Sequence, residues 1–188
     1  MTRSLPKVLD SDESTALVDV FNPRYDSGLK NLCMVRLMLE AGLRVSEVVG
    51  LEFDDLNMTT CRLHIRDGKG GKDRNLWVPH ELRDQIGQWL ERRPDAEGEW
   101  LFVTRNGTQL DPRSIRRTVK RYAEKAGIRW ADDVSPHTLR HTFATELLQR
   151  TRNIRLVQKA LGHARLSTTM IYTHIVDEEL EIAMKAGV

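Results

Sequence analysis

The sequence lacks long apolar runs and contains few cysteines. No run approaches the roughly 20 apolar residues that a membrane helix requires, and the N-terminal segment MTRSLPKVLDSDE lacks the apolar core of a signal peptide. The two cysteines, Cys33 and Cys61, have neither metal-site spacing nor a disulfide-rich context. We therefore expect a cytoplasmic protein without membrane association, whose cysteines stay reduced and carry no chemistry.

Internal repeats, low-complexity tracts and long linkers are absent as well. The chain has 188 residues, of which 40% are hydrophobic, and this is enough for one domain with a substantial core. We expect residues 1–188 to form a single domain that ends in a tail at 175–188.

Positive charge is concentrated in two segments, although the net charge is only +2. Residues 105–129 are strongly basic, residues 140–165 are basic again, and residues 176–188 are acidic. Clustered basic side chains suit a surface that contacts phosphates, although a solvated helix face has the same composition. The candidates for phosphate contact on the helix within the first segment are Arg113, Arg116, Arg117, Lys120 and Arg121.

Helical spacing of apolar side chains covers most of the chain. A capping box predicts a helix over 10–21, and a buried helix is expected over 27–41, where Gly42 ends it. Further helices are expected over 43–53, 80–92, 111–127, 136–150 and 153–163.

Two segments with alternating apolar side chains predict a β-hairpin. They cover 61–65 and 76–78, and the glycine-rich turn between them places Lys69 and Lys72 near its tip. The segment WLFVTRNG at 100–107 predicts a further short strand followed by a turn.

The helix expected after Ser135 carries three polar side chains on one face. His137, Arg140 and His141 have the spacing i, i+3 and i+4. Free N–H groups in the first turns favour an anion, and a guanidinium can bind a phosphate through two parallel hydrogen bonds. This pattern favours half of a phosphate site, although a polar helix face with two ordinary histidines is the alternative.

Metal binding is another alternative for this helix face. The inverzincin pattern H-x-x-E-H has a glutamate where this sequence has Arg140 between His137 and His141. An arginine supplies no general base and repels a cation, so we expect no metal and no cofactor.

Four motifs, in this order and spacing, closely resemble the catalytic domain of the tyrosine recombinases, the phage integrase and Xer-like family. They are AGLRVSEVVGL, GKGGKDR, SPHTLRHTFAT and LGHARLSTTMIYTH, and the resemblance extends from about Leu9 to about Glu181. It implies an α+β fold that is mainly α-helical, with a small antiparallel sheet or hairpin on one edge. It also implies a site-specific enzyme that cleaves and rejoins DNA through a 3′-phosphotyrosyl intermediate without metal or ATP.

The resemblance assigns the residues that hold the scissile phosphate. By position, Arg44 and Arg140 become the two phosphate-binding arginines, and His163 becomes the second histidine that contacts the phosphate. Glu47 matches an acidic position that supports the site from behind.

The resemblance also assigns the residues that move protons and form bonds. Tyr172 becomes the nucleophile, His137 the acid/base histidine and Lys69 the hairpin lysine, whereas Lys72 is expected to contact backbone phosphate and His141 to lie behind the site. A phenol has a pKa of about 10, so cationic neighbours can bring it toward phenolate. Its phosphate ester also has a good leaving group, which suits a reaction that must rejoin DNA strands.

Members of this family usually carry an N-terminal core-binding domain, which we expect to be absent here. The expected partner is double-stranded DNA, on which a chain that is monomeric alone forms a homo-tetramer. The tail at 175–188 is expected to dock on a neighbouring protomer or to pack on its own domain. Two other functions stay open: a DNA-binding regulatory module without cutting activity, and DNA relaxation of the type IB topoisomerase kind.

Overall fold

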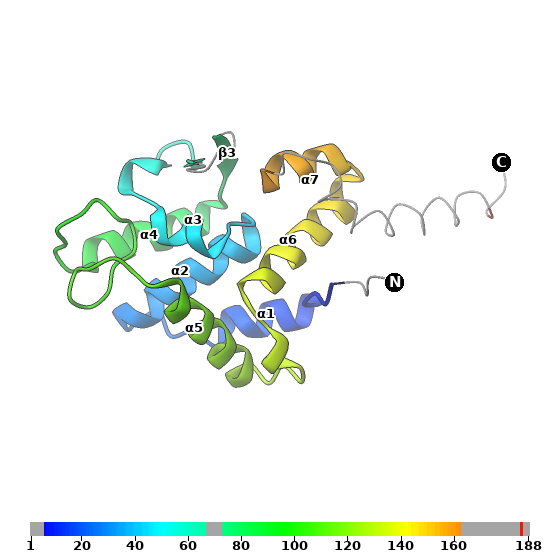
Figure 1. The fold of residues 1–188 in the computed structure, drawn as a ribbon, viewed down its shortest axis with the longest axis horizontal. Helices are drawn as coiled ribbons and strands as arrows, with labels where there is room; N and C mark the ends of the chain where they lie inside the picture. The colour runs from blue at the N-terminus through cyan, green and yellow to red at the C-terminus, as the bar shows by residue number, and fades with distance from the viewer. Residues whose placement is uncertain (1–5, 67–72, 163–184, 186–188) are drawn as a thin grey trace.

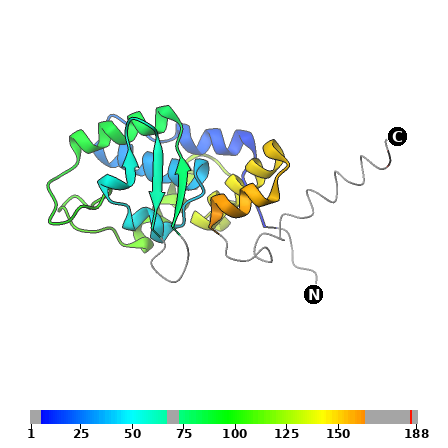
Figure 2. The same cartoon turned by 90° about the horizontal axis from the view of Figure 1, so that it is seen from above.

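The computed structural model describes residues 6–66, 73–162 and 185. Within these ranges the chain is mainly helical, with a small antiparallel sheet on one face of the helices (Figures 1 and 2), which confirms the predicted fold class. The helices are α1 (Ser11–Asp19), α2 (Asp26–Glu40), α3 (Val45–Gly50), α4 (His80–Arg92), α5 (Pro112–Lys125), α6 (Pro136–Thr151) and α7 (Ile154–Leu161). Single turns of 3-10 helix are η1 (Phe53–Asp55) and η2 (Ala131–Asp133).

Helix α2 is the centre of the helical layer. It contacts α1, α3, α4, α5 and α6, and most of its side chains are buried, as its apolar sequence predicts. It begins one residue earlier than predicted, at Asp26, and Gly42 follows its end with a φ of +66°. A Cβ at Gly42 would also lie 2.3 Å from the ring of Phe143, so this turn requires glycine on two grounds.

The sheet consists of β1 (Leu56–Asn57), β2 (Arg62–Ile65) and β3 (Arg74–Trp77) in the order β1-β2-β3. Leu63 pairs with Leu76 across β2 and β3, which confirms the predicted hairpin. The segment at 100–107 is predicted to form a short strand followed by a turn. The turn is confirmed, since the N–H of Gly107 donates to the carbonyl of Thr104, but the strand is wrong, because the structure forms only isolated bridges at Trp100 and Val103. Residues 101–103 are all fully buried, so this segment packs into the core and lacks the alternation of a strand that faces solvent.

The core continues from α2 to α4 and to the segment at 101–103. Trp89 donates its indole N–H to the carbonyl of Leu101 at 2.9 Å, which satisfies the polar atom of a buried ring. Both cysteines are free and buried, and burial raises the pKa of the Cys33 thiol to about 12. Among the helices of the described ranges, none has the length and apolar character needed to cross a membrane.

Candidate active site

Arg44 and Glu47 meet at the start of α3. Arg44 is the N-cap residue of this helix, and its backbone N–H donates to Glu47 Oε2 at 2.7 Å. Its Nη1 donates to Glu47 Oε1, also at 2.7 Å. The side chain of Arg44 is 35% exposed, whereas that of Glu47 is 9% exposed. A buried carboxylate therefore holds an arginine that reaches solvent.

Arg140 approaches the same carboxylate from α6. Ser135 caps this helix as predicted, and Arg140 lies in its second turn with a buried side chain. Its Nη1 donates to the carbonyl of Gly42 and its Nη2 donates to that of Leu161 at 2.6 Å. Nη1 also lies 3.7 Å from Glu47 Oε2. One guanidinium therefore joins α6 to the turn before α3 and to the end of α7.

Arg74 is a member of this cluster that the motifs did not single out. From the start of β3, its Nη1 and Nη2 donate to Glu47 Oε1 and Oε2 at 2.9 and 2.8 Å, and its Nε donates to the carbonyl of Ala160 at 2.8 Å. Its side chain is only 5% exposed. Strand alternation contained a signal, because residue 74 shares a face with the inward-facing Leu76, and a charge on that face needs a buried partner.

The three arginines keep Glu47 ionised. Burial alone would raise the pKa of this carboxyl. The hydrogen bonds and charge of Arg74, the backbone N–H of Arg44 and the charge of Arg140 outweigh burial and hold the pKa below its ordinary value. Three guanidinium groups against one carboxylate leave the cluster positively charged, so it attracts an anion.

The two histidines of α6 have different environments. His137 lies exposed in the first turn of the helix, and His141 is partly buried one turn later. Desolvation lowers the pKa of His141, and the charges of His137 and Arg140 lower it further. In residues 6–66, 73–162 and 185, no group of three or more His, Cys, Asp and Glu side chains could hold a metal ion.

Four of the predicted site residues lie outside the described residues: Lys69, Lys72, His163 and Tyr172. The tail at 175–188 also lies outside them, except for Lys185. The structure therefore brings together Arg44, Glu47 and Arg140, and it adds Arg74 to them.

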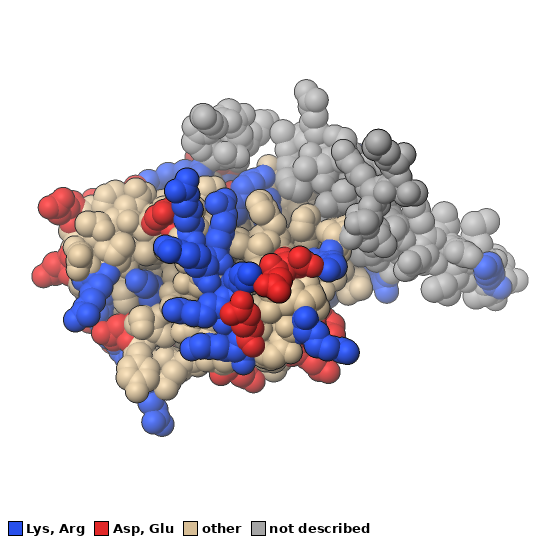
Figure 3. All heavy atoms as spheres, turned by 60° about the horizontal axis from the view of Figure 1, so that its bottom comes forward, with Lys and Arg blue, Asp and Glu red and all other residues tan. Residues whose placement is uncertain are grey.

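Helix α5 carries a row of basic side chains. The predicted residues are all exposed on this helix: Arg113, Arg116, Arg117, Lys120 and Arg121. Figure 3 shows a band of basic side chains across this side of the molecule. Lys120 pairs with Asp132 Oδ1 at 2.7 Å, and Arg117 and Arg121 line a shallow hollow.

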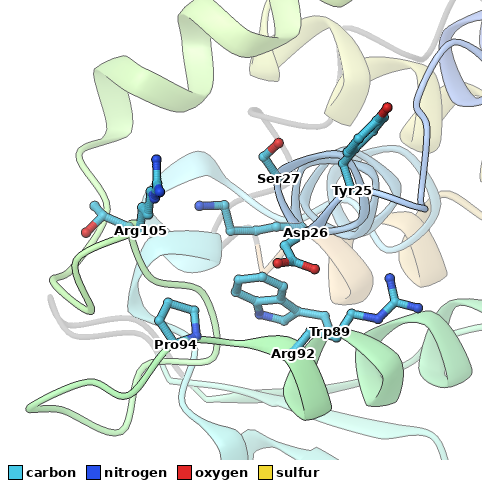
Figure 4. Close-up of a pocket in the computed structure, with 9 residues that line it drawn as sticks. Tyr25, Asp26, Ser27, Trp89, Arg92, Pro94 and Arg105 are labelled. Atoms are coloured by element: carbon cyan, nitrogen blue, oxygen red, sulfur yellow. The ribbon is translucent and has the colours of Figure 1, made fainter.

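A pocket of about 440 Å³ lies elsewhere, between the start of α2 and the end of α4 (Figure 4). In it, Lys30 donates to the carbonyl of Val103 at 2.8 Å and lies 5.6 Å from the ring centroid of Trp89. Burial lowers the pKa of Lys30. None of the predicted site residues lines this pocket, so the cluster around Glu47 is the candidate active site.

Comparison with known proteins decides the family. The model of the phage integrase family matches residues 7–179. The chain belongs to the phage integrase family. A curated relative in this family is the tyrosine recombinase XerA of Pyrococcus furiosus, which is 40% identical over 186 residues. The match covers 97% of this chain and 62% of the XerA protein, so the chain spans about three fifths of that relative's length.

Solved structures of the phage integrase family share the fold. A crystal structure of XerA recombinase has a TM-score of 0.84 and 33% identity, over 99% of this chain and 67% of that one. A crystal structure of the XerH site-specific recombinase, bound to palindromic difH substrate in a post-cleavage complex, has a TM-score of 0.84 and 28% identity. This match covers 96% of this chain and 53% of the XerH chain. The resemblance inferred from the four motifs is thereby confirmed.

Proposed function

We propose that this chain is the catalytic domain of a site-specific recombinase that cleaves and rejoins double-stranded DNA through a 3′-phosphotyrosyl intermediate. The main structural support is that the carboxylate of Glu47 contacts both Arg44 and Arg140, which come from distant parts of the chain. The names of the relatives support the proposal, because XerA is a tyrosine recombinase and XerH is a site-specific recombinase that was solved in a post-cleavage complex with its difH substrate.

The arginines stabilise the charge of the transition state. In-line attack on a phosphodiester accumulates negative charge on the nonbridging oxygens, and donors that are already in place stabilise this charge without reorganisation. Arg44 reaches solvent, where a phosphate can approach, and Arg140 is fixed by the carbonyls of Gly42 and Leu161. We assign His163 as a further donor to the same phosphate. These groups take the place of a metal ion.

The remaining residues move protons and electrons. The hydroxyl oxygen of Tyr172 attacks phosphorus and forms the phosphotyrosyl bond while the bond to the 5′ oxygen breaks. His137 accepts the tyrosine proton, and Lys69 gives a proton to the departing oxygen. The 5′ hydroxyl of a second strand then attacks the phosphotyrosine, the protons move in reverse, and the strand is sealed without ATP.

The basic row of α5 holds the DNA. Its five exposed basic side chains suit phosphate contacts, and Lys72 adds another from the hairpin. Exchange of strands between two duplexes requires several active sites, so we assign a homo-tetramer on DNA that assembles from monomers. The tail at 175–188 docks each protomer on its neighbour.

Covalent capture tests the proposed function. The protein is incubated with duplexes that are randomised around a nick, and complexes that survive denaturation are isolated and sequenced. We expect a covalent adduct on one sequence class, with the tyrosine joined to a 3′ phosphate. Binding without any adduct would instead indicate a regulatory module, and relaxation of supercoiled DNA without sequence preference would indicate a topoisomerase.

A further inference from the structure

Arg74 connects three parts of the candidate site. Its two terminal nitrogens bind both oxygens of Glu47, and its Nε binds the carbonyl of Ala160 in the last turn of α7. It lies on β3, the strand that returns from the turn with Lys69. The same guanidinium therefore contacts the carboxylate that holds Arg44 and the helix that ends just before His163.

The surroundings of Arg74 fix its guanidinium. Two parallel hydrogen bonds to the carboxylate of Glu47, which form a fork, restrain the plane of the guanidinium, and burial protects these bonds from water. Gly162 follows α7 with a φ of +65°, and a Cβ there would lie 3.0 Å from Arg74 Nη1. Gly162 therefore packs directly on the guanidinium of Arg74, and a larger residue at position 162 would press against it.

We propose that Arg74 is a positioning residue for DNA cleavage: it holds both oxygens of Glu47 and thereby fixes Arg44 and Arg140 against the scissile phosphate. This inference rests on the proposed function. All three guanidinium nitrogens of Arg74 donate to Glu47 or to the carbonyl of Ala160, so we assign Arg74 to the carboxylate and not to the phosphate. The effect of Arg74 passes through the carboxylate of Glu47. Without Arg74 this carboxylate would keep only its contacts with Arg44 and Arg140 among the described residues, and these are the two side chains that it has to hold in place.

Arg36 provides a matched control. It is 7% exposed, close to the 6% of Arg74, and it also pairs with carboxylates, those of Glu40 and Glu81. Its hydrogen-bond partners among the described residues are Glu40, Glu81 and Gln85, and none of them belongs to the cluster around Glu47. Arg36→Met and Arg74→Met therefore each remove a buried, paired arginine, but only one of them disturbs the candidate site.

The first measurement is the rate of strand cleavage with protein in excess over a nicked DNA site. We expect Arg74→Met to lower this rate by about 10²-fold, the effect of a misplaced catalytic group, while the dissociation constant for DNA changes little. Arg74→Lys keeps the charge but not the fork, so it should give an intermediate rate. Arg36→Met should lower thermal stability but keep the rate. Equal rate losses in the two methionine variants would overturn the proposal.

The second measurement asks which group transmits the effect. If Arg74 acts through Glu47, the double variant with Glu47→Gln should be no slower than Glu47→Gln alone. A substrate with sulfur at the departing 5′ position should not restore Arg74→Met, because a better leaving group does not replace misplaced arginines. Additive losses in the double variant, or rescue by sulfur, would show that Arg74 acts through the hairpin and not through Glu47.

The third measurement needs no cleavage. The Nε–H nuclear magnetic resonance signals of Arg44 and Arg140, assigned by substitution, report whether the two side chains move. We expect the signals of both arginines to shift in Arg74→Met and neither signal to shift in Arg36→Met. If the wild-type protein forms no adduct on any DNA, the proposed function fails, and these signals still decide whether Arg74 fixes the two arginines. Unshifted signals in Arg74→Met would refute that role.

Discussion

The guanidinium of Arg140 lies 3.7 Å from the carboxylate of Glu47, which joins α6 to the start of α3. Arg140 also binds the carbonyl of Gly42, so α6 contacts both the turn before Arg44 and α3 itself. This relationship explains how a short helix such as α3 can hold Arg44, the arginine that we propose binds the phosphate, in place. The helix itself is too short to be rigid alone, and tertiary contacts supply the restraint.

Glu47→Gln should lower strand cleavage by about 10²-fold and leave a buried amide that cannot neutralise three arginines. It should also remove a pH dependence of stability. The folded pKa of Glu47 is lower than its unfolded pKa, so its ionised form stabilises the fold above the unfolded value and this stabilisation is lost as the pH falls through the folded value. The stabilities of wild type and variant in urea should therefore differ most at neutral pH. The difference should begin to shrink below the unfolded pKa of about 4.3 and disappear as the pH falls through the lower folded pKa.

A gap in stability that stayed constant down to strongly acidic pH would contradict the assigned ionisation of Glu47. Asp55→Asn is the control, because its carboxylate is also buried and pairs with Arg66 outside the cluster. This variant should lose stability without losing the rate of cleavage.

The local elements of the fold were predictable because their signals are local. The capping box of Asp10, the cap of α6 at Ser135 and the cap of α7 at Asn153 all occur where the sequence predicts them. Strand β1 was missed because two residues give no periodicity to detect. The expected end of the first helix at Phe21 was also too late, since α1 ends at Asp19.

The candidate site was predictable only in part. Motif order predicted Arg44, Glu47 and Arg140, and the structure brings these three together. Motif order could not predict that Arg74 binds Glu47. That contact joins a strand to a helix across 27 residues, and no periodic pattern in the sequence encodes it. The alternation of β3 placed Arg74 on the buried face, but only the tertiary structure identifies its partner.

Tyr172→Phe should leave DNA binding nearly unchanged and abolish the covalent adduct, because only the hydroxyl is removed. Tyr122→Phe is the control, since Tyr122 stacks on Phe21 with ring centroids 3.9 Å apart and lies in α5. Denaturing gel electrophoresis of labelled DNA measures the adduct. An adduct that persisted in Tyr172→Phe would exclude Tyr172 as the nucleophile.

Cleavage should continue in excess chelator, because in the proposed mechanism arginines and histidines stabilise the phosphate in place of a metal. The measurement is adduct formation before and after dialysis against EDTA, with zinc added back to one sample. Loss of activity on dialysis that zinc restored would favour the alternative in which His137 and His141 bind a metal.

Arg117→Ala should weaken DNA binding at all sequences and reduce the slope of log K against log salt by about 0.9, the value for one lost phosphate contact. Arg117 is exposed on α5 and lines the hollow on the basic side of that helix. Arg92→Ala is the control, because Arg92 is also an exposed helical arginine but donates to the carbonyl of Pro23 near the start of α2. Fluorescence anisotropy at several salt concentrations gives the slope for each variant. Equal slopes for Arg117→Ala and Arg92→Ala would exclude α5 as a phosphate-binding surface.

Lys69→Ala should separate proton donation from phosphate binding. The departing 5′ oxygen would be a strongly basic alkoxide, so it needs a proton in the transition state, and a general acid contributes about 10² to 10⁴ in rate. Sulfur at that position leaves as a thiolate, whose conjugate acid has a pKa of about 8.5 by analogy with cysteine, and this needs far less help. Lys69→Ala should therefore be slow on ordinary DNA and largely restored on the sulfur-bridged substrate.

Arg140→Ala is the matched comparison for this last experiment. In the proposed mechanism its guanidinium stabilises charge on the nonbridging oxygens, which sulfur at the bridging position does not change. The sulfur-bridged substrate should therefore not restore the cleavage rate of Arg140→Ala. Lys72→Ala, on the same turn as Lys69, tests the choice between the two lysines and should cleave ordinary DNA at nearly the wild-type rate once binding is saturated. Equal defects of Lys69→Ala on both substrates would assign the proton to Lys72 or His137, because a residue that donates it must lose its importance when the leaving group no longer requires a proton.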